Sequence, residues 1–273
     1  MIRDLLRVEG PVDLGAIDTN ATPGDPGGKD AAKASLEEAV DEIADLQERL
    51  WAQHVVHDAR QRVLVVLQGM DCSGKGGAVK GSFAGANPRW LQITGFGAPT
   101  PEEREHHFLW RIRKVLPDPG TIGVFDRSHY EDIVAVRARD LAPREVWEPR
   151  HDEINAFEQQ LADDGCTVVK IFLHISPEYQ LERQLRRLER DDKRWKFDPG
   201  DIEDRKRWPR YQEAYEEVFA RCPGWHVVPA DNKWYRVWAV AQIVRETLRD
   251  LGLEFPTRPE LDVADLTRQL KEA

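Results

Sequence analysis

The sequence predicts an α/β fold built on a mostly parallel sheet of about five strands with helices on both faces. Continuous apolar runs of strand length recur along the chain, as is typical of parallel strands that are buried on both faces. Segments with helical periodicity separate these runs, so strand and helix alternate from residue 62 onward. The length of 273 residues suits one sizeable domain with appended helices, or at most two small domains.

The chain begins with a segment that predicts little regular structure. Residues 1–30 show little apolar periodicity and contain several turn-forming residues, namely Pro11, Pro23, Pro26 and the pair Gly27-Gly28. We expect an extended arm that forms no core. From Ala34 to about Ala59, apolar residues recur at steps of three and four, which predicts an amphipathic helix.

Five segments predict the strands. The strongest is residues 62–68, RVLVVLQ, and similar runs occupy 121–125, 167–174 and 225–229, with 89–94 as a weaker fifth candidate. Helical patterns lie at about 101–115, 143–164, 177–191, 204–221 and 235–251. We therefore expect a folded domain over residues 31–255, followed by a C-terminal tail over 256–273 that contains a short polar helix.

Composition narrows the class of protein. A net charge of −10 argues against a protein that coats nucleic acid or an anionic membrane, so neither is expected as a partner. A polyanionic substrate would need a local basic groove. No apolar run is long enough to span a membrane, no signal peptide opens the chain, and the three cysteines show no paired spacing. These features favour a reduced, cytoplasmic setting without disulfides or a zinc site.

A glycine-rich loop follows the first strand directly. Residues 69–77, GMDCSGKGG, fit the pattern G-x-x-x-x-G-K with Gly69, Gly74 and Lys75 at the required places. In such loops backbone N–H groups wrap a phosphate at a helix N-terminus, and the lysine reaches the terminal phosphates. The strand before and the helical sequence after favour this interpretation over a chance turn. They predict a P-loop kinase-like, three-layer fold, with Ser73, Gly76 and Gly77 as further loop contacts.

Two aspartates are candidate metal ligands. Gly76 stands where such loops usually carry the Ser or Thr that holds Mg²⁺, so a ligand must come from elsewhere. Asp71 lies inside the loop, although it could instead cap its own backbone. Asp126 follows the strand at 121–125, at the edge of the sheet where ligands bind, although it could instead cap a helix. Arg127 beside it can neutralise charge that develops in phosphoryl transfer.

A basic segment follows the strand at 167–174. A Ser-Pro-Glu helix start at residue 176 precedes seven basic residues within fourteen positions, Arg183, Arg186, Arg187, Arg190, Lys193, Arg194 and Lys196. This pattern fits a positively charged lid at about 177–200 that closes over phosphates and excludes water. It fits equally well a solvated helix face whose bases pair with neighbouring acids.

The chain resembles the polyphosphate kinase 2 family in five stretches that occur in family order. These are residues 69–77, 99–103 with 108–113, 125–132, 190–197 and 229–234. The resemblance implies phosphoryl transfer between inorganic polyphosphate and an adenine or guanine nucleoside mono- or diphosphate. It further implies a homo-oligomer, either a dimer or a tetramer.

The resemblance also implies roles for individual residues. Asp71 and Asp126 would hold Mg²⁺ (or Mn²⁺) and the acceptor phosphate, while Lys75 and Arg127 clamp phosphates. The best-matched lid positions are Arg183, Arg187, Lys193 and Lys196, and weaker candidates for polyphosphate or nucleotide contacts are Lys80, Arg111 and Glu131. Residues 130–132 look like the class that accepts both AMP and ADP. Two positions depart from that class, with Asp126 in place of Asn and Gly97 in place of Lys.

Two other functions fit part of the sequence. An ATP-dependent nucleoside monophosphate kinase shares the loop and an arginine-rich lid, and a test of the phosphoryl donor separates it from a polyphosphate enzyme. A non-catalytic module that binds nucleotide or polyphosphate would keep the fold. The presence of Asp71, Lys75 and Asp126 argues against that module.

Overall fold

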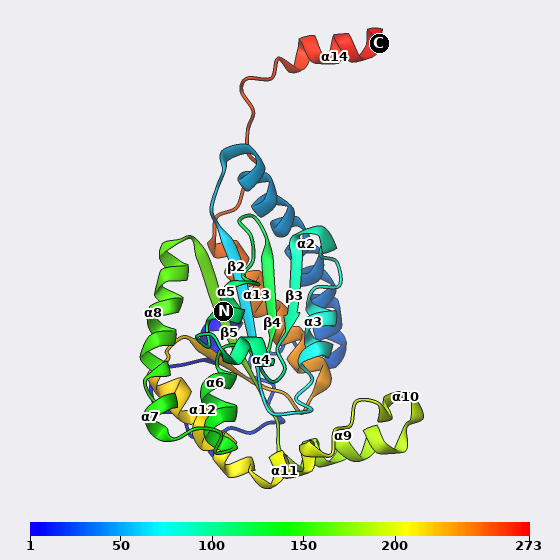
Figure 1. Ribbon diagram of the computed structural model, residues 1–273. Coiled ribbons are helices and arrows are strands. Elements are labelled where there is room, and N and C mark those ends of the chain that lie inside the picture. Colours follow the sequence, from blue (N-terminus) through cyan, green and yellow to red (C-terminus); the bar gives the residue numbers. More distant parts are fainter.

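The computed structural model describes residues 1–273 and contains one six-stranded sheet in the order β1-β6-β5-β2-β4-β3 (Figure 1). The strands are β1 (Arg7–Val8), β2 (Arg62–Gln68), β3 (Leu91–Gly95), β4 (Ile122–Asp126), β5 (Cys166–His174) and β6 (Trp225–Pro229). β2 to β6 run parallel, and β1 pairs antiparallel with β6 at one edge. The predicted parallel sheet of five strands is confirmed, with β1 added.

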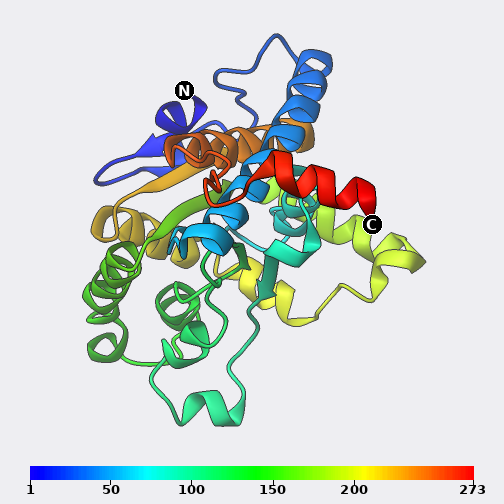
Figure 2. The same cartoon turned by 90° about the horizontal axis from the view of Figure 1, so that it is seen from above.

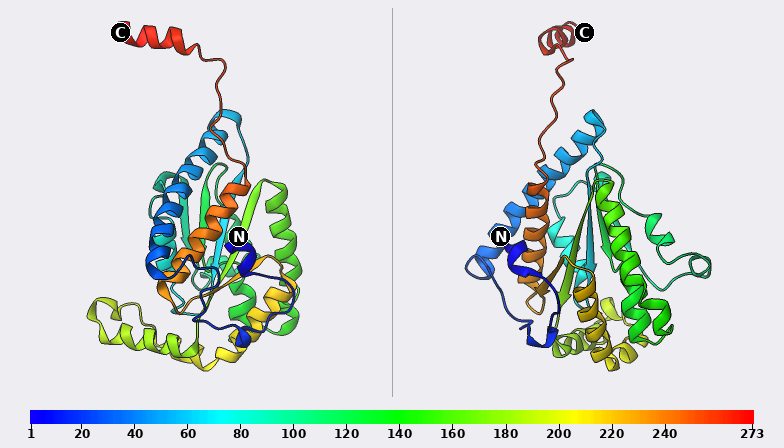
Figure 3. Two further views of the ribbon diagram at one scale, coloured as in Figure 1. Left: turned by 180° about the vertical axis from the view of Figure 1, so that it is seen from behind. Right: turned by 90° about the vertical axis from the view of Figure 1, so that its left-hand side faces the viewer.

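Helices cover both faces of the sheet and form a three-layer architecture. They are α1 (Ile2–Leu6), α2 (Lys29–His57), α3 (Lys75–Ser82), α4 (Pro101–Arg104), α5 (Trp110–Arg113), α6 (Glu131–Ala138), α7 (Arg144–Trp147), α8 (Arg150–Asp163), α9 (Pro177–Glu189), α10 (Asp191–Arg194), α11 (Gly200–Lys206), α12 (Trp208–Arg221), α13 (Lys233–Asp250) and α14 (Val263–Glu272). α2, α3 and α13 cover one face, and α6, α8 and α12 cover the other (Figure 3). None of these helices combines the length and the apolar character needed to cross a membrane.

Burial explains why the apolar runs became central strands. Every residue of β2 is buried, and so is every residue of β6, because helices pack on both sides. α13 is buried over most of its length because it lies between the sheet and α2. Proline interrupts two of the predicted helices: Pro149 stands between α7 and α8, and Pro209 follows the break between α11 and α12.

The N-terminal arm contributes to the core, so the expectation that residues 1–30 form none is wrong. Leu6 and Leu14 are 5% and 1% exposed and belong to the main hydrophobic cluster. The carboxylate of Glu246 on α13 accepts hydrogen bonds from the backbone N–H groups of Ile2 and Arg3, at 3.0 and 2.8 Å. These bonds satisfy the otherwise unpaired N-terminus of α1.

Two segments project from the body. α9 and α10 extend sideways from the end of the sheet where the parallel strands finish (Figure 1). α14 stands apart at the end of an extended segment on the opposite side of the molecule (Figures 1 and 3). Seen from above, α14 crosses in front of the body and α9 and α10 project to one side (Figure 2).

Candidate active site

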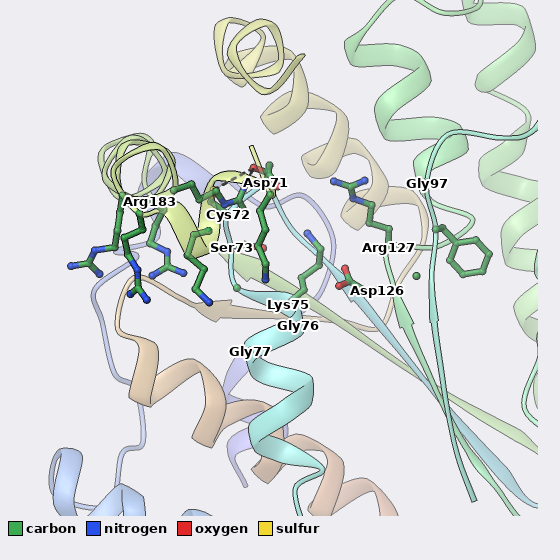
Figure 4. A pocket seen from close by; sticks show the side chains of 18 residues that line it. Asp71, Cys72, Ser73, Lys75, Gly76, Gly77, Gly97, Asp126, Arg127 and Arg183 are labelled. Carbon is green, nitrogen blue, oxygen red and sulfur yellow. Dashed lines mark hydrogen bonds and ion pairs between the residues drawn. The ribbon is translucent and has the colours of Figure 1, made fainter. Parts of the chain in front are cut away.

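A basic cavity of about 610 Å³ opens at the carboxyl ends of β2 and β4, between the glycine-rich loop and α9 (Figure 4). The register pairs Leu67 of β2 with Asp126 of β4, which brings the start of the loop beside the predicted second acid. The cavity is lined by the loop, by Asp126 and Arg127, and by six basic side chains from α9, α10 and the segment after them. Only two of its 18 lining residues are hydrophobic, so the site suits a polyanion.

The loop has the geometry of a phosphate cradle. Gly69 has φ +150°, and a Cβ there would lie 2.7 Å from the Leu173 carbonyl oxygen, so no larger residue fits. Gly74, with φ +91°, precedes α3, whose first residue is Lys75. The Ser73 hydroxyl is buried without a hydrogen-bond partner. Gly76 and Gly77 lie in the first turn of α3, so a helix N-terminus, the usual place for a bound phosphate, faces the cavity.

Lys75 and Asp126 both line the cavity, and their side chains lie near each other (Figure 4). The Lys75 ammonium donates to the Gly69 carbonyl oxygen at 3.0 Å. Burial lowers the pKa of Lys75, and the nearby Asp126 carboxylate partly opposes that shift. The Asp126 carboxylate itself is open to the cavity and caps no helix. Its position suits a ligand for a cation or a phosphate-bound metal.

Arg127 occupies an unusual backbone conformation. Its φ is +65°, in the left-handed region that non-glycine residues seldom adopt. Its N–H donates to the Leu67 carbonyl oxygen at 3.0 Å, which fixes the turn to β2. Burial lowers the pKa of its guanidinium, but the charges of Glu131 and Asp71 outweigh that effect, so the group stays cationic.

Asp71 pairs with the basic segment. The Arg187 guanidinium lies 3.0 Å from the Asp71 carboxylate and 3.5 Å from that of Asp201 on α11. Burial alone would raise the pKa of Asp71, but Arg187 and Lys75 outweigh it and hold that pKa below its usual value. Gln180 of α9 also donates to the Asp71 carbonyl oxygen at 3.1 Å. The structure therefore ties α9 directly to the loop.

All four of the best-matched positions, Arg183, Arg187, Lys193 and Lys196, line the basic cavity. Arg186 and Arg190 line it as well, although each also has an acidic neighbour, Glu182 at 3.8 Å and Asp192 at 2.9 Å. Three leucines of α9 are exposed: Leu181, Leu185 and Leu188. The segment therefore combines basic side chains that line the cavity with exposed leucines, and its action as a lid stays a prediction.

A second cavity, of about 560 Å³, adjoins the basic cavity and differs from it in chemistry. Ten of its 23 lining residues are hydrophobic, among them Val136, Leu141 and Trp208. The two cavities share four residues, which are Asp71, Phe96, Gly97 and Arg127. A Cβ added at Gly97 would meet nothing within 4 Å, so the absence of a lysine there leaves open space at the junction.

The weaker candidates fall in two different places. Arg111 lines the second cavity, where its guanidinium donates to the Gly97 carbonyl oxygen at 3.0 Å and pairs with Asp132 at 3.3 Å. Glu131 also lines the second cavity. Lys80 is exposed on α3 and lines neither cavity. Polyphosphate contact through Arg111 or Lys80 therefore has no support from their positions.

Sequence reasoning missed one cluster in the second cavity. Arg139 at the end of α6 pairs with Asp204 on α11, and Tyr211 of α12 lies 2.8 Å from the Arg139 guanidinium. These three residues come from separate helices with no shared motif. No signal in the sequence alone places them together.

A phosphate loop at the carboxyl ends of a parallel sheet, facing a basic helical segment, defines a kinase of the P-loop type. Residues 29–254 match the family model described as Polyphosphate kinase 2 (PPK2). The chain belongs to this family.

Individual relatives agree with that assignment. The chain is 42% identical to an AMP/ADP-polyphosphate phosphotransferase of Meiothermus ruber, over 92% of this chain and 94% of the relative. It is 35% identical to an ADP-polyphosphate phosphotransferase of Rhodopseudomonas palustris, over 90% and 88%. The crystal structure of polyphosphate kinase 2 from Arthrobacter aurescens TC1 matches with a TM-score of 0.95 and 39% identity, covering 100% of this chain and 97% of that one.

Proposed function

We propose that this enzyme transfers a phosphoryl group between inorganic polyphosphate and a nucleoside mono- or diphosphate, with Mg²⁺. The observation that carries the proposal is the junction of two chemically different cavities at Asp71 and Arg127. Phosphoryl transfer requires donor and acceptor to meet in line at one centre that neutralises charge. Family membership and the names of the relatives support polyphosphate, rather than ATP, as the partner substrate.

The basic cavity is the proposed site of the polyphosphate chain. Eight cationic side chains line it in a protein whose net charge is −10, so the cavity attracts a polyanion locally. Lys75 and the loop N–H groups would hold the phosphates nearest the reaction centre. The basic segment α9–α10 would then act as a lid that excludes water from the transfer.

The second cavity is the proposed site of the nucleotide. Its apolar wall at Val136, Leu141 and Trp208 suits a base and sugar, which are less polar than a phosphate chain. Its other end reaches Arg127 and Asp71, where the nucleotide phosphate would meet the donor. AMP and ADP are the proposed acceptors, in line with the names of the two relatives.

The basic cavity offers too few ligands to hold a metal ion by protein side chains alone, but it suits Mg²⁺, which is usually held partly by substrate. No group of three or more His, Cys, Asp or Glu side chains could hold a metal ion. Mg²⁺ is usually bound by one or two carboxylates together with water and substrate phosphates, and Asp71 and Asp126 line the same cavity. Asp71 and Asp126 would hold the ion, which would supply positive charge to neutralise the phosphates. Arg187 would leave the Asp71 carboxylate and contact the phosphate chain instead. Mn²⁺ favours the same oxygen ligands.

The direct test is ATP formation from purified protein, Mg²⁺, long-chain polyphosphate and ADP, with AMP as a parallel acceptor. We expect ATP from ADP, and none when polyphosphate is omitted. Product from AMP would extend the acceptor range to monophosphates. Transfer that requires ATP and ignores polyphosphate would instead assign the chain as a nucleoside monophosphate kinase, and absence of any turnover would favour a binding module.

We predict that the double variant Arg183→Ala, Arg187→Ala weakens polyphosphate binding more than it lowers kcat. Both guanidinium groups line the basic cavity, so the KM for polyphosphate should rise. The slope of log KM against log salt concentration should become shallower by about one to two units. Each phosphate contact that is lost reduces the number of counterions released when polyphosphate binds. The matched control replaces Arg144 and Arg268, which lie on exposed surfaces outside both cavities. An unchanged KM and salt slope would reduce the lid to a solvated helix.

A further inference from the structure

A buried charged cluster lies next to the loop that carries Asp126 and Arg127, but outside both cavities. Lys170 is the one charged residue in the middle of β5, and it is 5% exposed. Its ammonium pairs with the carboxylate of Glu158 on α8 at 2.6 Å. A buried lysine is rare unless it is paired, and Glu158, whose side chain is 13% exposed, supplies that partner.

The cluster holds two consecutive residues that follow Arg127 closely in the chain. The Tyr130 hydroxyl donates to the Glu158 carboxylate at 2.9 Å and accepts from the Lys170 ammonium at 3.1 Å. The His129 ring nitrogen Nε2 lies 3.2 Å from the same carboxylate. His129 and Tyr130 are both 0% exposed. Burial alone would raise the pKa of Glu158, but His129 and Lys170 outweigh it, and the carboxylate stays ionised.

The register of the sheet places this cluster at the level of the turn that contains Asp126 and Arg127. Lys170 of β5 pairs with Val66 of β2, and Val66 pairs in turn with Phe125 of β4. Asp126 and Arg127 follow Phe125 immediately. The cluster therefore fixes the chain directly after the turn, while the bond from Arg127 to Leu67 fixes the turn itself.

The left-handed backbone of Arg127 needs such support. A non-glycine residue with φ +65° is strained, and such residues persist only where the surrounding structure enforces them. A buried ion pair is a weak source of stability, because apolar residues of similar volume often replace it without loss. Stability alone therefore does not account for Glu158 and Lys170.

We propose that Glu158, with Lys170, is a positioning residue for phosphoryl transfer: through Tyr130 and His129 it keeps Arg127 in its left-handed conformation, with its guanidinium at the junction of the two cavities. The proposal rests on the proposed function for its kinetic consequence. Its structural consequence is independent, because it concerns the order of residues 126–131 in the enzyme without substrate.

The test is the variant Glu158→Gln, which keeps the size of the side chain and removes its charge. We expect kcat to fall by up to about 10²-fold, because a small displacement of Arg127 misaligns the transferring phosphate. The KM for polyphosphate should change little, since the lid is untouched. In an Arg127→Ala background the same substitution should cause no further loss, because its effect acts through Arg127. Losses that multiply independently in the double variant would overturn the proposal.

Amide hydrogen exchange gives a second readout that needs no turnover. Glu158→Gln should accelerate exchange in residues 126–131, and unchanged exchange there would overturn the proposal even if kcat fell. The matched control is Asp164→Asn, which breaks the 2.7 Å pair with buried Arg62 at the start of β2. It should affect neither kcat nor exchange at 126–131.

A milder variant covers the case in which Glu158→Gln does not fold. Tyr130→Phe removes only the hydroxyl that bridges Lys170 and Glu158. It should reproduce both effects at smaller size, and wild-type behaviour in both readouts would overturn the proposal. If the wild-type enzyme transferred no phosphate from polyphosphate, the proposed function would fail, while hydrogen exchange would still decide the positioning role.

Discussion

Replacing Asp126 by asparagine is expected to remove nearly all phosphoryl transfer and leave the fold intact. The side chain ends β4 and lies open to the basic cavity, so the isosteric amide breaks no structural interaction. The class that the chain resembles usually carries Asn at this position, but in this chain Gly76 replaces the usual Ser or Thr ligand, so Asp126 is one of only two carboxylates proposed to hold Mg²⁺. Loss of a group that stabilises developing charge costs on the order of 10²- to 10³-fold in kcat. Turnover of ADP to ATP and a thermal unfolding curve, measured side by side, check both parts.

An Asp-to-Asn substitution at the other end of β4 is the control that separates the position of the carboxylate from the loss of its charge. Asp118 is exposed just before β4, and its carboxylate accepts a hydrogen bond from Gln92 at 3.3 Å. Asp118→Asn removes the same charge and should retain wild-type kcat. Raising Mg²⁺ should partly restore Asp126→Asn if the carboxylate binds metal. Near-normal turnover in Asp126→Asn would discard the metal role.

The features that the sequence predicted correctly are those whose geometry is set by residues that adjoin one another in the chain. The loop at 69–77 lies between a strand and a helix that adjoin it in the sequence, so its geometry follows from local rules. Asp126 was placed by the same logic, because the carboxyl end of a parallel strand is fixed once the strand is recognised. The basic segment was visible as a local excess of positive charge, and six of its side chains line one cavity in the structure.

The remaining features depend on contacts between distant parts of the chain. The pairing of Arg187 with Asp71 joins residues 116 positions apart, and nothing in either local pattern announces it. The arm reaches the core through single leucines, Leu6 and Leu14, which produce no periodicity. Lys170 is different, because a lysine inside the apolar run TVVKIFLH was visible in the sequence. A charge in a buried strand should itself prompt a search for its partner.

Removing the loop lysine is the second substitution for which we expect a large effect. Lys75 begins α3, and its ammonium is held by the Gly69 carbonyl oxygen rather than by a carboxylate, so its charge is available to phosphate. Lys75→Ala should lower kcat/KM for polyphosphate on the order of 10²- to 10³-fold, by loss of a preorganised cation at the transferring group. Lys33→Ala, on the exposed surface of α2, is the matched control and should have no effect.

The pH profile distinguishes a catalytic charge from a structural one. Burial lowers the pKa of Lys75, so the free enzyme should lose this ammonium at a lower pH than an ordinary lysine would. Because the protonated form binds phosphate, kcat/KM should decline as pH rises through that lowered pKa. Lys75→Arg keeps a charge that does not titrate in this range, so the surviving activity should lack the alkaline decline. A decline that persisted unchanged in Lys75→Arg would assign the ionisation to another group and leave Lys75 a purely electrostatic anchor.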